Sequence, residues 1–125
     1  MNPKQFLTWG GIILVLLGIY GFFDADVPGS AFYLDNGENW AHLILGVVAI
    51  VAARSLSESA QRSLTLLVGI IAIVFAVWGY FVAGRPEPNL GVANLEHPAD
   101  NLLHLVVGIW ALVASRGRTM MAAGL

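Results

Sequence analysis

The apolar stretch NWAHLILGVVAIVAAR, residues 39–54, decides the fold because the chain contains it twice. A second version, NLLHLVVGIWALVASR, covers residues 101–116 and has Asn, His, Gly and Arg in the same places. The preceding apolar runs also correspond, since GIILVLLGIYGFF at residues 11–23 aligns with GIIAIVFAVWGYF at residues 69–81. This self-similarity predicts a helix–loop–helix unit that occurs twice. The predicted repeats are residues 5–55 and 63–117.

The composition is typical of a membrane protein. Hydrophobic residues make up 58% of the 125 residues and charged residues only 11%, which leaves too little polar sequence to cover four apolar segments in a soluble fold. The first and third segments are long enough to cross a hydrocarbon core of about 30 Å. The second and fourth are shorter and need Arg54 and Arg116 to extend their side chains to the interface. We expect one all-α domain over residues 1–125, a transmembrane four-helix bundle with spans at about residues 5–23, 38–54, 63–83 and 99–116.

The charges predict one orientation in the membrane. Each repeat crosses twice, so both repeats run the same way, and a pseudo-twofold axis along the membrane normal is expected to relate them. Five of the six basic residues flank the termini and the connection at residues 54–63, and Arg85 alone lies on the other side. Seven of the eight acidic residues fall in the two long loops, residues 24–38 and 82–100. Because Lys and Arg mark the cytoplasmic side, we expect both termini in the cytoplasm.

The ends of the segments carry further signals. No small-x-small cleavage pattern follows residues 1–23, so we expect this segment to remain as the first span. Asp35 followed by Glu38 resembles a capping box for the second helix, and Pro98 suits the first turn of the fourth. Aromatic residues near the outer ends form an expected interfacial belt: Tyr20, Phe22, Phe23, Trp40, Trp78, Tyr80 and Phe81.

Small and polar residues form one stripe on the second segment and the same stripe on the fourth. They recur every three or four residues and so share one helix face about 80° wide. Small residues let helix backbones approach closely in lipid, so this face is the expected helix–helix interface. Its residues are Asn39, His42, Gly46, Ala49 and Ala53, with the twins Asn101, His104, Gly108, Ala111 and Ser115. The first and third segments carry a matching stripe, also interpreted as packing: Gly11, Gly18 and Gly21 against Gly69, Ala76 and Gly79.

Three interpretations of the inward histidines, His42 and His104, stay open. In the first, each neutral imidazole makes a hydrogen bond across the bundle, for example to the Asn of the other repeat. In the second, the two imidazoles at one depth bind a tetrapyrrole, either as both axial ligands of a haem or as one ligand each to a chlorophyll. In the third, they sense protons or metal ions from the outer face together with Glu38, Asp100 and His97.

Other classes of function are not favoured. No Asp or Glu falls inside a span and no proline breaks one, which leaves a small transporter only as a lesser alternative. The sequence offers no nucleophile, base and orienting residue, so we expect no enzyme activity. Cysteine is absent, which excludes thiol chemistry and cysteine-based metal sites. No nucleic-acid partner is expected.

The doubled Asn-x-x-His-Leu-x-x-Gly motif, at residues 39–46 and 101–108, resembles a bacterial family of small four-helix membrane proteins known only as a domain of unknown function. The resemblance implies a protein of the bacterial cytoplasmic membrane with four helices and no assigned catalysis. We expect an interaction or scaffold protein whose partners are the lipid bilayer and either copies of itself or a larger membrane complex, in which it would be an accessory subunit.

Overall fold

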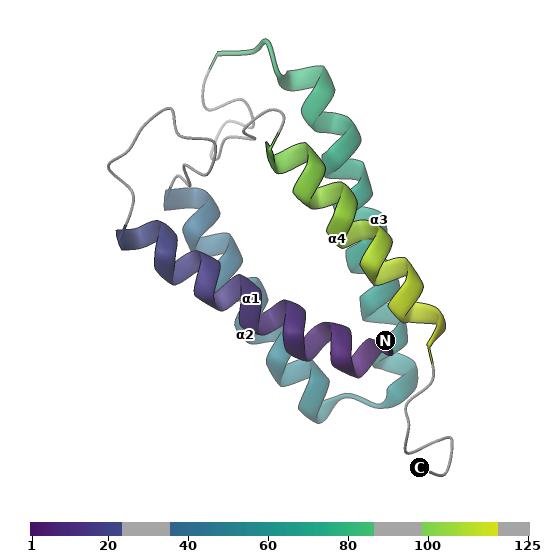
Figure 1. Ribbon diagram of the computed structural model, residues 1–125. Helices are drawn as coiled ribbons and strands as arrows, with labels where there is room; N and C mark the ends of the chain where they lie inside the picture. The colour runs from purple at the N-terminus through teal and green to yellow at the C-terminus, as the bar shows by residue number, and fades with distance from the viewer. Residues whose placement is uncertain (24–35, 87–98, 118–125) are drawn as a thin grey trace.

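The computed structural model describes residues 1–23, 36–86 and 99–117, and these residues form helices and turns without a strand (Figure 1). The helices are α1 (Pro3–Phe23), α2 (Asn36–Ser55), α3 (Glu58–Val82) and α4 (Ala99–Arg116). The expected all-α class is therefore confirmed. The predicted cap at Asp35, the predicted first-turn Pro98 and the loop residue His97 lie outside the described residues.

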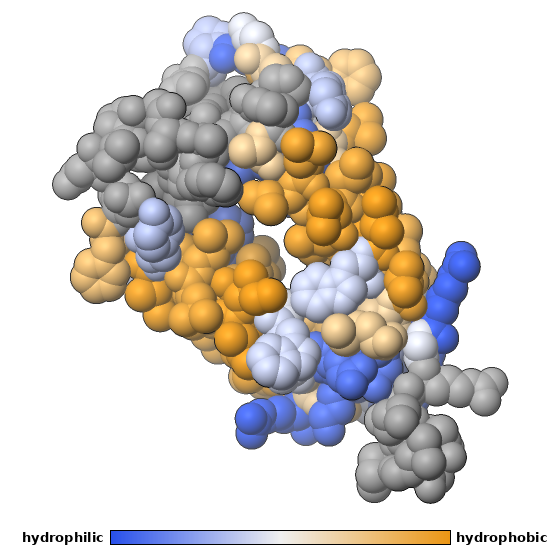
Figure 2. Space-filling model, in the orientation of Figure 1, coloured by the Kyte–Doolittle hydropathy of each residue, from blue (hydrophilic) through white to orange (hydrophobic). Residues whose placement is uncertain are grey.

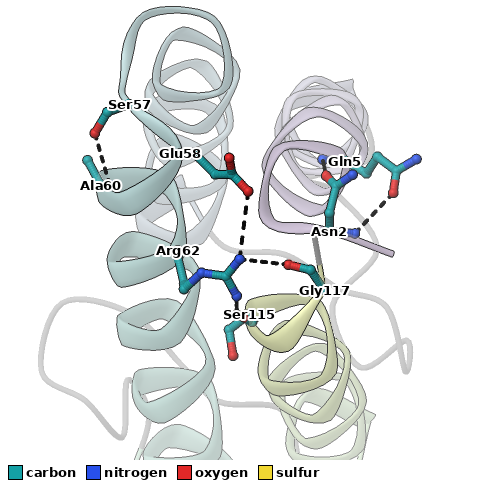
Figure 3. Close-up of polar contacts among 8 residues, drawn as sticks. All are labelled: Asn2, Gln5, Ser57, Glu58, Ala60, Arg62, Ser115 and Gly117. Carbon is teal, nitrogen blue, oxygen red and sulfur yellow. Dashed lines mark hydrogen bonds and ion pairs between the residues drawn. The ribbon is translucent and has the colours of Figure 1, made fainter. Parts of the chain in front are cut away.

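Two helices begin at side-chain caps. At the start of α1, Asn2 and Gln5 form a reciprocal capping box, in which each backbone N–H donates to the other's side-chain oxygen at 3.0 and 2.9 Å (Figure 3). At the start of α3, the Ser57 hydroxyl accepts from the N–H of Ala60 at 3.2 Å. Helix α3 thus begins at Glu58, and the connection from α2 is shorter than the predicted residues 54–63. The sequence prediction began the third helix where the charged residues stop. In the structure, the mostly polar residues 58–62 already belong to α3.

The four helices form two antiparallel hairpins, α1 with α2 and α3 with α4. The hairpins meet where α1 lies against α3 and α4, and they diverge toward the ends at which α2 and α4 begin (Figure 1). Helices α1 and α3 start at the same end of the molecule, so the two hairpins run in the same direction. A cluster of buried side chains at that end joins three helices: Phe6 and Leu7 of α1, Ala52 and Ala53 of α2, and Ala111 and Ala114 of α4.

The distribution of hydrophobic side chains is the reverse of that in a soluble domain. Among the described residues, nine hydrophobic side chains are buried and six of them are alanine, whereas 32 large hydrophobic residues are exposed. Figure 2 shows these apolar side chains as broad surfaces over both hairpins, with hydrophilic residues gathered at the ends. A monomeric soluble protein rarely exposes continuous apolar patches of this extent.

By length and composition, two helices in the described part of the chain can cross a membrane, namely α1 and α3. The polar residues at both ends of α2 and α4 lower the mean hydropathy of these shorter helices of 20 and 18 residues. By length and composition, the structure therefore supports the first and third of the four predicted spans.

Candidate functional site

The stripe residues of α2 and α4 lie in the contacts within each hairpin. Asn39, Asn101 and Ala111 are 0%, 2% and 0% exposed. Gly46 and Gly108 are buried as well, and Ala49 is half-buried. Helices α2 and α4 therefore face their hairpin partners with their small and amide side chains.

Corresponding glycines bring the helix backbones together in both hairpins. A Cβ atom added to Gly46 would lie 2.7 Å from the carbonyl oxygen of Gly11. A Cβ on Gly108 would lie 3.1 Å from the carbonyl oxygen of Gly69. Both distances are shorter than an ordinary van der Waals contact, so the two backbones of each helix pair approach closely at these glycines.

The two asparagines also lie against glycines of the partner helix. A Cβ on Gly21 would overlap the Asn39 Oδ1 atom and lie 2.6 Å from its Cγ, and a Cβ on Gly79 would overlap the Asn101 Oδ1 atom and lie 2.5 Å from its Cγ. Each amide oxygen thus occupies the space beside a glycine Cα, an arrangement that allows a Cα–H···O contact between close helices. The sequence predicted both stripes but not this pairing. The signal was present, since the same Gly and Asn recur at corresponding positions of both halves.

The structure places the two histidines in different hairpins and does not bring their rings together. The His104 ring lies beside Phe75 of α3, with ring centroids 5.7 Å apart. Its Nδ1 lies 2.8 Å from the carbonyl oxygen of Asp100, one turn earlier in the same helix. A carbonyl can only accept, so Nδ1 carries a proton, and in the neutral form of the ring Nε2 carries the lone pair. This bond runs within α4, whereas the sequence prediction placed a bond across the bundle. His42 is half-buried on α2.

A buried carboxylate precedes each asparagine. Glu38 and Asp100 are each 8% exposed, and with the residues that follow they form the sequences Glu-Asn-x-x-His and Asp-Asn-x-x-His. Four of the five residues of the sensor interpretation thus lie in the first two turns of α2 and of α4, as one carboxylate and one histidine on each helix. Within the described ranges, no three of the acidic and histidine side chains come close enough to hold a metal ion.

The opposite end of the molecule carries polar contacts that sequence analysis missed (Figure 3). The Gln61 side-chain amide donates to the carbonyls of Ala53, Leu56 and Ala52 at 2.9, 3.2 and 3.3 Å. The neighbouring Arg62 guanidinium donates to the carbonyls of Ser115 and Gly117, the latter at 2.8 Å, and lies 3.8 Å from Glu58. Gln61 and Arg62 near the start of α3 therefore donate to backbone carbonyls at the ends of both α2 and α4.

An apolar cavity of about 170 Å³ lies between the hairpins. Residues of all four helices line it, among them Gly10, Leu45, Val68 and Trp110. At one end the ring of Phe6 meets that of Trp110 edge to face, with centroids 4.7 Å apart. Figure 2 shows a hollow between the hairpins on this side of the molecule.

These observations define a class of small all-α proteins built from two apolar helical hairpins. Residues 38–117, which cover nearly all of α2 and the whole of α3 and α4, match the family described as a domain of unknown function, DUF4383. The chain belongs to this family, which confirms the expected membership in a family of unknown function. No curated protein and no solved structure matches the chain.

Proposed function

We propose that the protein is a multi-pass protein of the bacterial cytoplasmic membrane, in which all four helices span the bilayer. The observation that carries this proposal is the reversed distribution of side chains, with alanine, glycine and asparagine inside and large apolar residues outside. Such an exterior suits hydrocarbon, where close packing through small residues drives helix association. Helices α2 and α4 are short, and the exposed Arg54 and Arg116 extend them to the interface.

We further propose that the two hairpins are duplicated repeats with both termini in the cytoplasm. The matching Gly–Gly and Asn–Gly contacts of the two hairpins support the duplication. The orientation is supported by the basic residues Lys4, Arg54, Arg62 and Arg116, which lie at the end where α1 and α3 begin. The seven aromatic residues of the predicted belt are all exposed, as the outer interface requires.

Cysteine accessibility tests the membrane topology, because the chain contains no cysteine of its own. Two exposed positions serve as probes, Ser57 between α2 and α3 and Gly84 after α3. In intact bacterial cells, a membrane-impermeant maleimide is expected to label the Gly84→Cys variant and to label Ser57→Cys only after permeabilisation. Equal labelling of both variants in intact cells, or release of the protein by alkaline carbonate, would contradict the proposal.

The biochemical role that fits this geometry is a non-catalytic interaction or scaffold protein, such as an accessory subunit of a larger membrane complex or a homo-oligomer. The apolar faces of the short helices α2 and α4 support contact with larger neighbours. Purification in a mild detergent is expected to yield a defined complex above the size of a single chain. Recovery of free monomer alone would argue strongly against this role.

A second candidate function is tetrapyrrole binding through His42 and His104. The favouring observation is the bond from His104 Nδ1 to the Asp100 carbonyl, because such a bond fixes the tautomer with Nε2 available as a ligand. An absorption band of the purified protein that disappears in the His104→Ala variant would support this function. A colourless protein would exclude it, and His104→Ala would then only lower stability, by about 0.6 to 2 kcal/mol, as for other polar contacts between membrane helices.

A further inference from the structure

The cavity between the hairpins is lined entirely by aliphatic side chains, aromatic side chains and glycine. Gly10 forms part of its wall, and a Cβ added there would have its nearest neighbour, the Trp110 ring, at 3.9 Å. The adjacent Gly11, in contrast, lies against the backbone of α2. Gly10 therefore has room for a Cβ in ordinary van der Waals contact with the Trp110 ring, and a larger side chain at this position would extend into the cavity.

The chemistry of this lining selects an apolar occupant. A buried water needs two to four polar partners, and this wall offers none. The volume of about 170 Å³ is close to that of an engineered apolar cavity of about 150 Å³ that stays dry and binds benzene. An occupant of this site is consequently a hydrocarbon group that enters through the open side of the hollow.

The charges at one end of the cavity specify what this hydrocarbon is attached to. Each of the four lining helices carries one basic residue at the end where α1 and α3 begin: Lys4, Arg54, Arg62 and Arg116. Within the described ranges, Glu58 is the only acidic residue at that end. An apolar cavity next to a net positive charge matches a molecule that has an apolar chain and an anionic head.

We propose that the cavity binds one acyl chain of an anionic phospholipid, whose phosphate lies against the basic end of the bundle. The assignment rests on the proposed membrane function, since it takes the ligand from the surrounding bilayer. The bound chain fills the space between the hairpins, and the headgroup neutralises part of the charge of the basic residues. The lipid is thereby a structural ligand that joins two hairpins whose direct contacts lie mainly along α1.

Lipid retention tests this assignment. The protein is reconstituted in vesicles of equal phosphatidylglycerol and phosphatidylcholine, extracted with a mild detergent and analysed by native mass spectrometry. We expect one phospholipid per chain, with phosphatidylglycerol preferred by about fivefold for one basic contact. The Gly10→Leu variant, which places a side chain in the cavity, is expected to retain no phospholipid. The matched control is Gly84→Leu, because a Cβ at Gly84 has no neighbour within 4 Å and this variant should bind lipid like the parent protein.

A second pair of variants covers the case in which Gly10→Leu does not fold, as judged by circular dichroism. Val68 lines the cavity and Val74 of the same helix is exposed. Val68→Phe is expected to lose the lipid, and Val74→Phe is expected to keep it. The variant Lys4→Gln is expected to reduce the preference for phosphatidylglycerol while the chain remains bound.

The possible failures are distinguishable. Release of the protein from the vesicles by alkaline carbonate would refute the proposed membrane function itself. A membrane-integrated protein that retains no lipid, or retains equal amounts in the parent protein and the Gly10→Leu variant, would overturn only the lipid assignment. Equal retention of the two phospholipids would overturn the anionic headgroup. Loss of a dimer instead of a lipid in Gly10→Leu would assign the cavity to a second copy of the chain and overturn the proposal.

Discussion

Two neighbouring glycines of α1 have opposite surroundings. A Cβ on Gly11 would lie 2.8 Å from the carbonyl oxygen of Gly46, whereas a Cβ on Gly10 would have its nearest neighbour at 3.9 Å. Both residues occupy the same helix, so substitution by alanine improves the helix propensity of each by the same amount. The difference in unfolding free energy between the two variants therefore measures the effect of the close approach of α1 and α2.

We expect Gly11→Ala to lower the free energy of unfolding by about 1 to 3 kcal/mol, because the added methyl group forces two helix backbones apart. Gly10→Ala should instead be neutral or raise it by up to about 1 kcal/mol, since only helix propensity changes. Denaturation by a strong detergent, followed by circular dichroism, measures both. If the two variants unfold alike, the close backbone approach does not determine stability.

The contact between Gly21 and Asn39 predicts energetic coupling. Gly21→Ala alone should be destabilising by about 1 to 3 kcal/mol, because the methyl group would overlap the buried amide oxygen. In an Asn39→Ala background the overlap is removed, so the same substitution should cost less by at least about 0.5 kcal/mol. A double-mutant cycle measures this coupling, and the cycle of Gly79 and Asn101 should repeat it. Additive effects in both cycles would show that the amides do not contact the glycines.

The ends of the helices depend on side chains from neighbouring elements. Gln61 and Arg62 are consecutive residues near the start of α3, yet Gln61 binds the end of α2 and Arg62 binds the end of α4. Consecutive helix residues point about 100° apart, which lets one turn reach two different neighbours. The start of α3 thus holds the last turns of two helices in place.

We expect Arg62→Ala to increase hydrogen exchange in the last turn of α4, because the carbonyls of Ser115 and Gly117 lose their donor. Arg62→Lys should restore little of the protection, since an ammonium group lacks the planar fork that reaches two carbonyls at once. The matched control is Arg54→Ala, which removes an exposed charge at the same end. Unchanged exchange in Arg62→Ala would contradict the proposed role of this cap.

Sequence patterns predicted the helices better than the contacts between them. Apolar periodicity and the doubled motif predicted four helices, which the described residues contain, and they predicted one shared face for Asn39, Gly46 and their twins, because spacing along a helix determines its face. The capping by Gln61 and Arg62 was not predicted. Their partners are backbone carbonyls, which every residue carries, so no side-chain pattern marks them. The cavity also has no sequence signal, since it depends on how two hairpins meet.

The molecule as a whole consists of two tightly packed hairpins joined over a smaller area. Side-chain contacts between the hairpins include the edge-to-face pair of Phe6 and Trp110 and the hydrogen bonds from Gln61 to the end of α2. The remaining space between the hairpins includes the apolar cavity. We therefore expect the helix packing within each hairpin to vary less than the angle between the two hairpins.

We expect Trp110→Ala to broaden the distribution of distances between the hairpins. Spin labels at the exposed positions Phe23 of α1 and Phe81 of α3, introduced as cysteines, report this distance by electron–electron double resonance. The control pair is Phe81 with Leu102, which lie in the same hairpin and should keep a narrow distribution. Equal broadening of both pairs would indicate general unfolding, and no broadening would show that the aromatic pair does not fix the angle.

The cap formed by Gln61 also has an effect during synthesis. When the ribosome has translated the chain only as far as Ser55, the last carbonyls of α2 have no side-chain donor, because Gln61 has yet to be added. This cap of α2 therefore forms only after the start of α3 has been synthesised, so the last turn of the first hairpin gains its side-chain donor from a residue that lies beyond that hairpin in the chain.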